Sequence, residues 1–216
     1  MLLDLHTHST ASDDSRATVE QYVKWIDVLR RKGSHIDGFV LTEHRHFDHN
    51  LDYSYLSSDS GLVILKGAEL DTDSGHFLVY GVNSCITNRL DFTNVDLRAV
   101  ELVSICDEFG AIAVPAHPGR VGIGFAEFVK DGLSEFGSIE TVEQLNGSNR
   151  PGEGERAQEM VEKYGFKGTG GSDAHIVSAI GTCLTKFQNY INSEEDLVKE
   201  LRTMNFEAVT INEVSS

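Results

Sequence analysis

Short apolar stretches alternate with amphipathic stretches along nearly the whole chain. Residues 17–33 carry apolar side chains such as Val19, Tyr22 and Ile26 at helical spacing, and Gly33 offers a natural end to that helix. The same spacing predicts further helices over 95–110, 152–165 and 193–204. Short apolar runs predict strands over 2–6, 35–44, 61–70, 76–82, 111–117, 139–146, 182–187 and 206–211, with a strand and turn within 166–175.

Strands that alternate with amphipathic helices are typical of an α/β fold with a mostly parallel sheet. About seven such units favour a barrel over an open, doubly wound sheet, although periodicity alone leaves both arrangements open. The 216 residues contain no linker, repeat or low-complexity tract. We therefore predict a single domain over residues 1–216, long enough to bury a substantial core.

The charge balance narrows the choice of partners. The net charge is −16, from 34 acidic and 18 basic residues, which argues against a nucleic-acid polymer as the partner. The three cysteines are far apart and form no CxxC pair, so reduced thiols and a cytoplasmic protein are expected. The chain starts without a signal-peptide pattern and has no apolar run of about 20 residues, so no membrane partner is expected. The oligomeric state is left open.

Ionisable side chains collect at the carboxyl-terminal ends of five predicted strands. His6 and His8 are two residues apart and therefore share one face of a strand. In barrels and open α/β sheets, the carboxyl-terminal strand ends form the active face, so residues that are distant in sequence converge there. The residues in question are His6, His8, His44, Glu69, His117, Asp173 and His175.

Imidazoles and carboxylates together suit Zn, Mn or Fe. One structural zinc needs only four ligands, so this set predicts two or three divalent transition metals. Neighbouring metals stabilise both the attacking and the leaving oxygen in phosphoryl transfer. The remaining histidines, His35, His46 and His49, are expected at the surface, with a substrate contact as the alternative for His46 or His49.

Five ordered motifs carry a family resemblance: "DLHTHSTASD", "LTEH", "GAE", "AHPGR" and "GSDAH". With them the chain resembles, from Leu3 to about Gly181, the polymerase and histidinol phosphatase (PHP) family of metal-dependent phosphoesterases. The resemblance implies a distorted (β/α)7 barrel of the PHP type, in agreement with the strand count.

The resemblance also implies how three metals would share the ligands. His6, His8 and Asp173 would hold the first metal, Glu69 would bridge the first and second, His76 and His117 would complete the second, and Asp13, His44 and His175 would hold the third. Asp13 falls where the family motif has its aspartate, which favours it over Asp14. Two features depart from the family: Glu43 stands where relatives often have Asp, and the interval from Glu69 to His76 is short.

Three further polar residues are candidates around these ligands. Arg120 follows His117 by three residues, and its guanidinium is suited to bind a phosphate group and to stabilise its charge. Asn146 ends another strand and is a candidate for contact with the substrate or for orienting a ligand. Asp4 is a candidate for orienting a ligand histidine, or else a plain strand-start aspartate.

These features favour a hydrolase in which a metal-activated hydroxide cleaves a small phosphomonoester of the nucleotide, sugar phosphate, histidinol phosphate or phosphotyrosine type. Arg120, Asp173 and His175 are the expected catalytic residues, the last two as candidate general acids. One alternative is a nuclease or cyclic phosphodiesterase that acts on nucleotides or oligonucleotides. Another is a non-catalytic metal-binding regulatory domain, against which the intact ligand set counts.

Overall fold

The computed structural model describes residues 1–129, 132–133, 136 and 138–214. The strands in these residues are β1 (Leu2–Thr7), β2 (Gly38–His44), β3 (Val63–Thr72), β4 (Gly75–Tyr80), β5 (Ile112–Pro115), β6 (Thr141–Asn146), β7 (Lys167–Gly171), β8 (Cys183–Phe187) and β9 (Phe206–Thr210). The helices are α1 (Val19–Arg31), α2 (Ser54–Ser60), α3 (Ser84–Arg89), α4 (Ala99–Glu108), α5 (Glu153–Tyr164), α6 (Glu194–Thr203) and α7 (Ile211–Val214), with 3-10 turns at Phe125–Glu127 and Val177–Ala179.

The main sheet has seven strands in the order β5-β4-β3-β2-β1-β8-β9, and β6 and β7 form a second, two-stranded sheet. The pairs β1/β2, β2/β3 and β6/β7 are parallel, whereas β3/β4, β4/β5, β1/β8 and β8/β9 are antiparallel. The α/β class is therefore confirmed, but the prediction of a mostly parallel sheet was wrong. The physical reason is that β3 returns directly into β4 as a hairpin, without a crossover helix.

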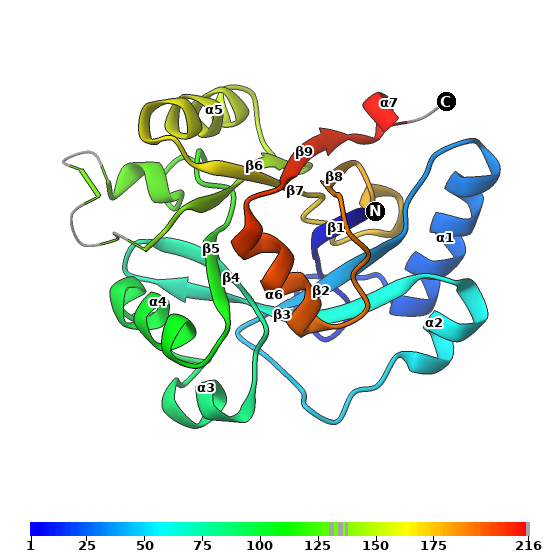
Figure 1. Ribbon diagram of the computed structural model, residues 1–216, viewed down its shortest axis with the longest axis horizontal. Coiled ribbons are helices and arrows are strands. Elements are labelled where there is room, and N and C mark those ends of the chain that lie inside the picture. Colours follow the sequence, from blue (N-terminus) through cyan, green and yellow to red (C-terminus); the bar gives the residue numbers. More distant parts are fainter. Residues whose placement is uncertain (130–131, 134–135, 137, 215–216) are drawn as a thin grey trace.

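The small sheet lies against the end of β1, and this contact curls the architecture. Thr7 forms a parallel bridge with Ala174, the His8 amide donates to the Ala174 carbonyl at 3.0 Å, and the Asp173 amide donates to the His6 carbonyl at 2.8 Å. In Figure 1 the strands occupy the middle of the molecule, with α1 and α2 on one side, α3 and α4 on the other, and α5 at the top. The described pairings do not confirm a regular (β/α)7 barrel.

The glycines of "GTGG" make this docking possible. We expected a tight turn there, but Gly170 and Gly171 lie within β7. A Cβ on Gly171 would lie 2.4 Å from the His6 Cβ, and one on Gly170 would lie 2.3 Å from the Leu184 carbonyl oxygen. These glycines therefore let β7 approach β1 and β8 closely, and the strand delivers Asp173 to the end of β1.

Helix α1 holds the end of β1 in place. The helix begins with a capping box between Thr18 and Gln21. Its Tyr22 is fully buried, and the hydroxyl donates to the carbonyl oxygens of His8 at 2.8 Å and Ala174 at 2.7 Å. The apolar face of the predicted helix thus also carries a polar contact that fixes two backbone segments beside His8.

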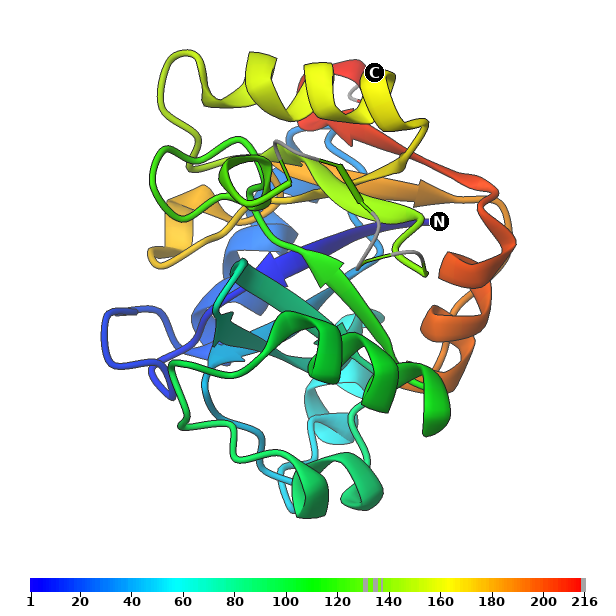
Figure 2. The ribbon, with the colours of Figure 1, turned by 90° about the vertical axis from the view of Figure 1, so that its left-hand side faces the viewer.

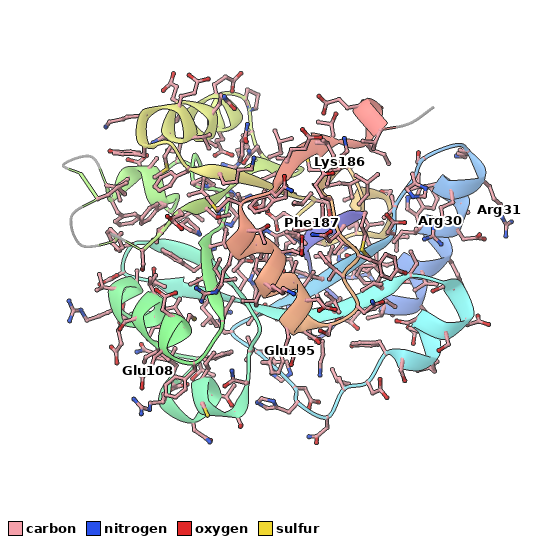
Figure 3. The ribbon with its side chains drawn as sticks, in the orientation of Figure 1. Arg30, Arg31, Glu108, Lys186, Phe187 and Glu195 are labelled. Atoms are coloured by element: carbon pink, nitrogen blue, oxygen red, sulfur yellow. The ribbon has the colours of Figure 1, made fainter. Side chains whose placement is uncertain are left out.

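Apolar side chains from the strands and from α6 fill the space between the layers. Leu5 on β1, Val114 on β5 and Leu201 on α6 belong to one buried cluster, and α6 crosses the strands in Figure 1. Strand β8 is buried except at Lys186, which lies 2.8 Å from Glu207 on the neighbouring strand; Figure 3 labels Lys186 and the buried Phe187 beside it. No helix among the described residues is long and apolar enough to cross a membrane.

Candidate metal centre

The carboxyl ends of β1, β2 and β3 lie at one edge of the sheet because these strands are parallel. Strand β4 runs the opposite way, so His76 near its start lies at that same edge. Strand β5 is antiparallel to β4, so His117, just beyond its end, returns there as well. Figure 2 shows β1 running from the N-terminus to the side where the loops after β1, β6 and β7 gather.

A first group of possible metal ligands consists of His6, His8, Glu69 and Asp173, all buried. The Nε2 atoms of His6 and His8 are 3.0 Å apart, and Glu69 Oε2 lies 3.1 and 3.2 Å from them. Asp173 Oδ1 lies 3.5 Å from both nitrogens. Four donor atoms from three separate segments of the chain therefore surround one small space.

These distances fit a single cation. Two ligand atoms about 2.0–2.2 Å from a tetrahedral zinc lie roughly 3.3–3.6 Å apart, and smaller angles bring them to about 3 Å. The observed separations of 3.0–3.5 Å match that geometry. Two imidazoles and two carboxylates are also the donor types that Zn, Mn and Fe accept.

A second group shares Glu69 with the first. Glu69 Oε1 lies 3.0 Å from His76 Nδ1 and 2.9 Å from His117 Nε2, while Oε2 faces the first group. This is the bridging arrangement that the resemblance implies for Glu69. The short interval to His76 is no obstacle, because the β3–β4 hairpin brings the two side chains to one edge. The buried Nδ1 of His117 has no hydrogen-bond partner in the described part of the chain.

A third group consists of His8, His44 and His175, with the Nε2 atoms of His44 and His175 3.2 Å apart. Here the structure differs from the sequence expectation. Asp14 Oδ2 lies 3.4 Å from His44 Nε2 and 3.2 Å from His175 Nε2. Both Asp13 and Asp14 are exposed and neither is among the donors of the three groups of described residues, so the two short distances are what favours Asp14. The Arg16 amide donates to the His175 carbonyl at 3.0 Å, which draws the Asp14 end of the loop alongside His175.

We expect Asp14→Asn to weaken the third metal position about 10-fold or more, because its carboxylate faces both histidines of that position. Asp13→Asn is the matched control, with the same charge change one residue away, and should leave metal content unchanged. Elemental analysis after dialysis against limiting Zn²⁺ compares the two variants. Loss of an ion in Asp13→Asn alone would restore the sequence-based assignment.

Glu43, one of the two departures from the family, serves the loop after β1. Its buried carboxylate accepts hydrogen bonds from the Ser9 amide at 3.0 Å and from the Ser9 and Ser12 hydroxyls at 2.6 Å each. Ser12 Oγ in turn accepts from the His44 amide at 3.0 Å. Glu43, which directly precedes His44 in the sequence, therefore fixes the loop that carries Asp14.

Glu143 is a site residue that sequence reasoning missed. Its buried carboxylate lies 2.9 Å from His6 Nδ1 and accepts from the His117 amide at 2.7 Å and from Asn146 Nδ2 at 2.9 Å. A carboxylate on the outer nitrogen of a ligand histidine fixes the tautomer and the ring orientation. The only signal in the sequence was its place inside the predicted strand 139–146, three residues before the Asn146 that we did select.

Asp4 acts on the backbone and not on a histidine ring. It is fully buried and accepts hydrogen bonds from the amides of Ser172 at 2.8 Å, Gly181 at 2.7 Å and His6 at 3.3 Å. Burial raises the pKa of its carboxyl group to about 6, and the hydrogen bonds with Ser172 act in the opposite direction. Asp4 thus holds the segments on both sides of Asp173 against β1.

Arg120 and Asn146 both lie beside Asp173. Arg120 Nη2 donates to Asp173 Oδ2 at 2.8 Å and lies 3.5 Å from Asn146 Oδ1, and the Arg120 side chain is 23% exposed. Asn146 Nδ2 reaches Asp173 Oδ2 at 3.4 Å. One oxygen of Asp173 therefore faces the histidines while the other is held by Arg120.

His46 and His49 are exposed, as expected, and His49 Nε2 lies 2.9 Å from the Thr87 hydroxyl.

The charges of the cluster are strongly coupled. Burial opposes a charge on His6, but Glu143, Asp173 and Glu69 outweigh it and raise the pKa of His6 well above its ordinary value. Burial likewise opposes the charge on Glu69, yet the surrounding histidines, His6 foremost, hold its pKa well below the usual range. The pKa of Asp173 is lowered for the same reason, against its burial. The centre therefore attracts positive charge, as protons or as metal ions that displace them.

Backbone strain is concentrated at this edge. Arg45, His117 and Asp173 have φ values of 50°, 30° and 53°, a backbone region that residues other than glycine rarely adopt. Each of them is a candidate ligand or adjoins one. Such conformations cost on the order of 1–3 kcal/mol each and are retained where surrounding contacts demand them.

The family model PHP_C, described as PHP-associated, matches residues 151–205. The matched stretch contains "GSDAH", the last of the five ordered motifs that begin at Leu3. Over this quarter of its length the chain is similar to PHP-associated sequences. No curated protein is similar enough in sequence to count as a relative.

Several solved structures share the fold of this chain. PsfC from Pseudomonas syringae is 19% identical with a TM-score of 0.72, covering 97% of this chain and 91% of that chain. A Bifidobacterium adolescentis protein named as a metal-dependent phosphoesterase is 14% identical with a TM-score of 0.59, covering 93% and 95%. Endonuclease Q, solved with a duplex that carries an abasic lesion, is 14% identical with a TM-score of 0.67, covering 96% of this chain and 58% of that chain.

Proposed function

We propose that this protein is a PHP-type metal-dependent phosphoesterase that hydrolyses a small phosphomonoester of the nucleotide, sugar phosphate, histidinol phosphate or phosphotyrosine type. The observation that carries the proposal is the shared carboxylate: Glu69 turns one oxygen to each of two adjacent donor groups. Adjacent metals suit phosphoryl transfer because they act on the attacking and leaving oxygens together. Two or three ions of Zn, Mn or Fe fit the donor types.

The metals, when bound, would lower the pKa of a water and withdraw charge from the phosphoryl oxygens. The residues of the chain then have separate tasks. Glu69 sets the separation of the two positions, and Glu143 fixes the ring of His6. Arg120 lies at the rim, where its partly exposed guanidinium suits a phosphate oxygen once it shares or leaves Asp173.

The leaving group needs a proton donor. Asp173 and His175 are our candidates, and both lie among the ligands. His175 is the more accessible of the two, at 27% exposure against 4% for Asp173. We therefore favour Asp173 for holding the first position, and His175 for proton transfer with only the first two positions occupied, because a metal on its Nε2 would leave it no proton to give. Asn146, which contacts Glu143, Asp173 and Arg120, fits an orienting role better than direct contact with the substrate.

A nuclease is the second candidate function. The fold likeness to Endonuclease Q favours it and weakens our expectation that nucleic acid is not a partner. Two observations favour a small substrate instead. The net charge of −16 offers little basic surface for a polymer, and this chain matches only 58% of the Endonuclease Q chain. The single domain over 1–216 and the cytoplasmic location stay predictions.

We expect kcat/KM for a 5′-nucleotide or a sugar phosphate to exceed that for a short single-stranded oligonucleotide at least 10-fold. A terminal phosphate dianion needs only the centre and Arg120, whereas a polymer also draws on surface cations. The assay uses the same Mn²⁺ or Zn²⁺ and the same salt for all substrates. Preference for the oligonucleotide would establish the nuclease function instead. Turnover of neither substrate by the metal-replete protein would favour the regulatory domain.

A further inference from the structure

The β3–β4 hairpin brings a second acid to His76. Asp71 is the direct cross-strand partner of His76, so both side chains lie on one face of the hairpin. Asp71 Oδ1 is 2.9 Å from His76 Nε2, while His76 Nδ1 is 3.0 Å from Glu69 Oε1. The imidazole therefore lies between two carboxylates, one at each ring nitrogen.

Asp71 is held in turn by Arg45. Arg45 Nη1 donates to Asp71 Oδ2 at 2.7 Å, so the two oxygens of Asp71 have different partners. The Arg45 amide also donates to the Glu69 carbonyl at 2.8 Å. Its φ of 50° lets the chain turn away directly after His44, so that the ring of His44 faces the cluster while the guanidinium of Arg45 reaches Asp71.

The chemistry of imidazole makes this arrangement directional. A neutral imidazole has one N–H and one acceptor nitrogen. Donation from Nε2–H to Asp71 leaves the Nδ1 lone pair facing Glu69 Oε1, where two acceptors meet unless a cation lies between them. A carboxylate on the far nitrogen of a histidine is the usual partner of a metal-binding histidine and raises its basicity.

We propose that Asp71 is a positioning residue for the second metal position: it holds His76 with Nδ1 presented to that position, and Arg45 holds Asp71. The inference rests on the proposed metal centre and deepens it. It gives a role to Asp71, which lies two residues after the shared Glu69 and is only 22% exposed. It also gives Arg45 a task that no motif assigned to it.

A surface ion pair is the competing explanation. Arg45 is 37% exposed, and exposed ion pairs contribute about 0–1 kcal/mol to stability. That explanation predicts a small change in melting temperature and no change in metal affinity. The two explanations therefore differ in a quantity that can be measured without a substrate.

The experiment compares stepwise Zn²⁺ dissociation constants, from competition with a chromophoric chelator, in the wild type, Asp71→Ala, Asp71→Asn and Arg45→Met. We expect Asp71→Ala to weaken one step 10–100-fold and to leave the others within about threefold. Asp71→Asn, which retains an acceptor oxygen, and Arg45→Met should show smaller losses at the same step. Asp107→Asn, in the Arg202–Asp107 pair that links α6 to α4, is the matched control and should change none.

A double-mutant comparison tests whether Asp71 acts through His76. Adding Asp71→Ala to His76→Ala should cost nothing further at that step, and the visible spectrum of the Co²⁺-loaded double variant should match that of His76→Ala. Additive losses, or unchanged affinities in Asp71→Ala and Asp71→Asn, would overturn the inference and leave the metal centre standing. A wild type that binds no Zn²⁺ would overturn the proposed function together with the inference.

Discussion

Glu69→Gln is expected to lower kcat about 10³-fold while changing the unfolding free energy of the metal-free protein by only about 1–3 kcal/mol. The side chain keeps its shape but loses the charge that both donor groups share. One oxygen lies 3.1 Å from His6 Nε2 and the other 2.9 Å from His117 Nε2, so one substitution affects two metal positions. Steady-state turnover of a phosphomonoester and a chemical denaturation curve give the two quantities.

Glu200→Gln is the matched control for this change. Glu200 is also a buried glutamate, but it lies on α6 and pairs with Asn189 at 3.0 Å. We expect it to alter stability without altering kcat. Retention of wild-type turnover in Glu69→Gln would rule out the bridging role, and equal losses in both variants would show that turnover merely follows folding.

Much of the centre could be predicted because strand ends are visible in sequence. His6, His8 and His44 each end a short apolar run, and parallel strands bring such ends together. Glu143 could not be selected in that way, since it lies within a strand and not at its end. Its role depends on which face of β6 meets His6, and that follows only from three-dimensional packing.

The choice between Asp13 and Asp14 shows a second limit. Both residues lie within one position of the motif, and the direction of the loop sets which carboxylate faces His44 and His175. That direction depends on hydrogen bonds from distant segments: Glu43 on β2 holds Ser9 and Ser12, and the His175 carbonyl holds the Arg16 amide. Contacts across such sequence separations leave no local pattern.

Sheet direction was the main feature that the sequence did not reveal. We predicted separate strands over 61–70 and 76–82, but β3 runs on to Thr72 and β4 starts at Gly75. This tighter hairpin makes β4 antiparallel and sets His76 opposite Asp71. Alternation and turn residues indicate that strands exist, whereas their direction depends on the length of the connection.

Removal of the metals is expected to lower the melting temperature by about 8–16 °C. A ligand present at 1,000 times its dissociation constant stabilises the folded state by about 4.1 kcal/mol, and each kcal/mol is worth about 2–4 °C in a chain of this size. We expect metal binding to increase the stability of the folded state because the buried donor atoms are close together. The Nε2 atoms of His6 and His8 are 3.0 Å apart, and Glu69 Oε2 lies 3.1 Å from His6 Nε2. The melts are recorded with a strong chelator and again after Zn²⁺ or Mn²⁺ is returned.

Elemental analysis of the reconstituted protein should find two or three ions per chain, and Glu69→Gln should lose most of the metal-dependent rise in melting temperature. Asp13→Asn should keep the whole rise, since Asp13 is exposed and lies outside the donor groups of the described residues. One ion or none, or a rise below about 2 °C at saturating metal, would contradict a multinuclear centre. A rise of equal size in the wild type and Glu69→Gln would mean that the metals bind elsewhere on the acidic surface, because the donor groups on both sides of Glu69 would then have played no part.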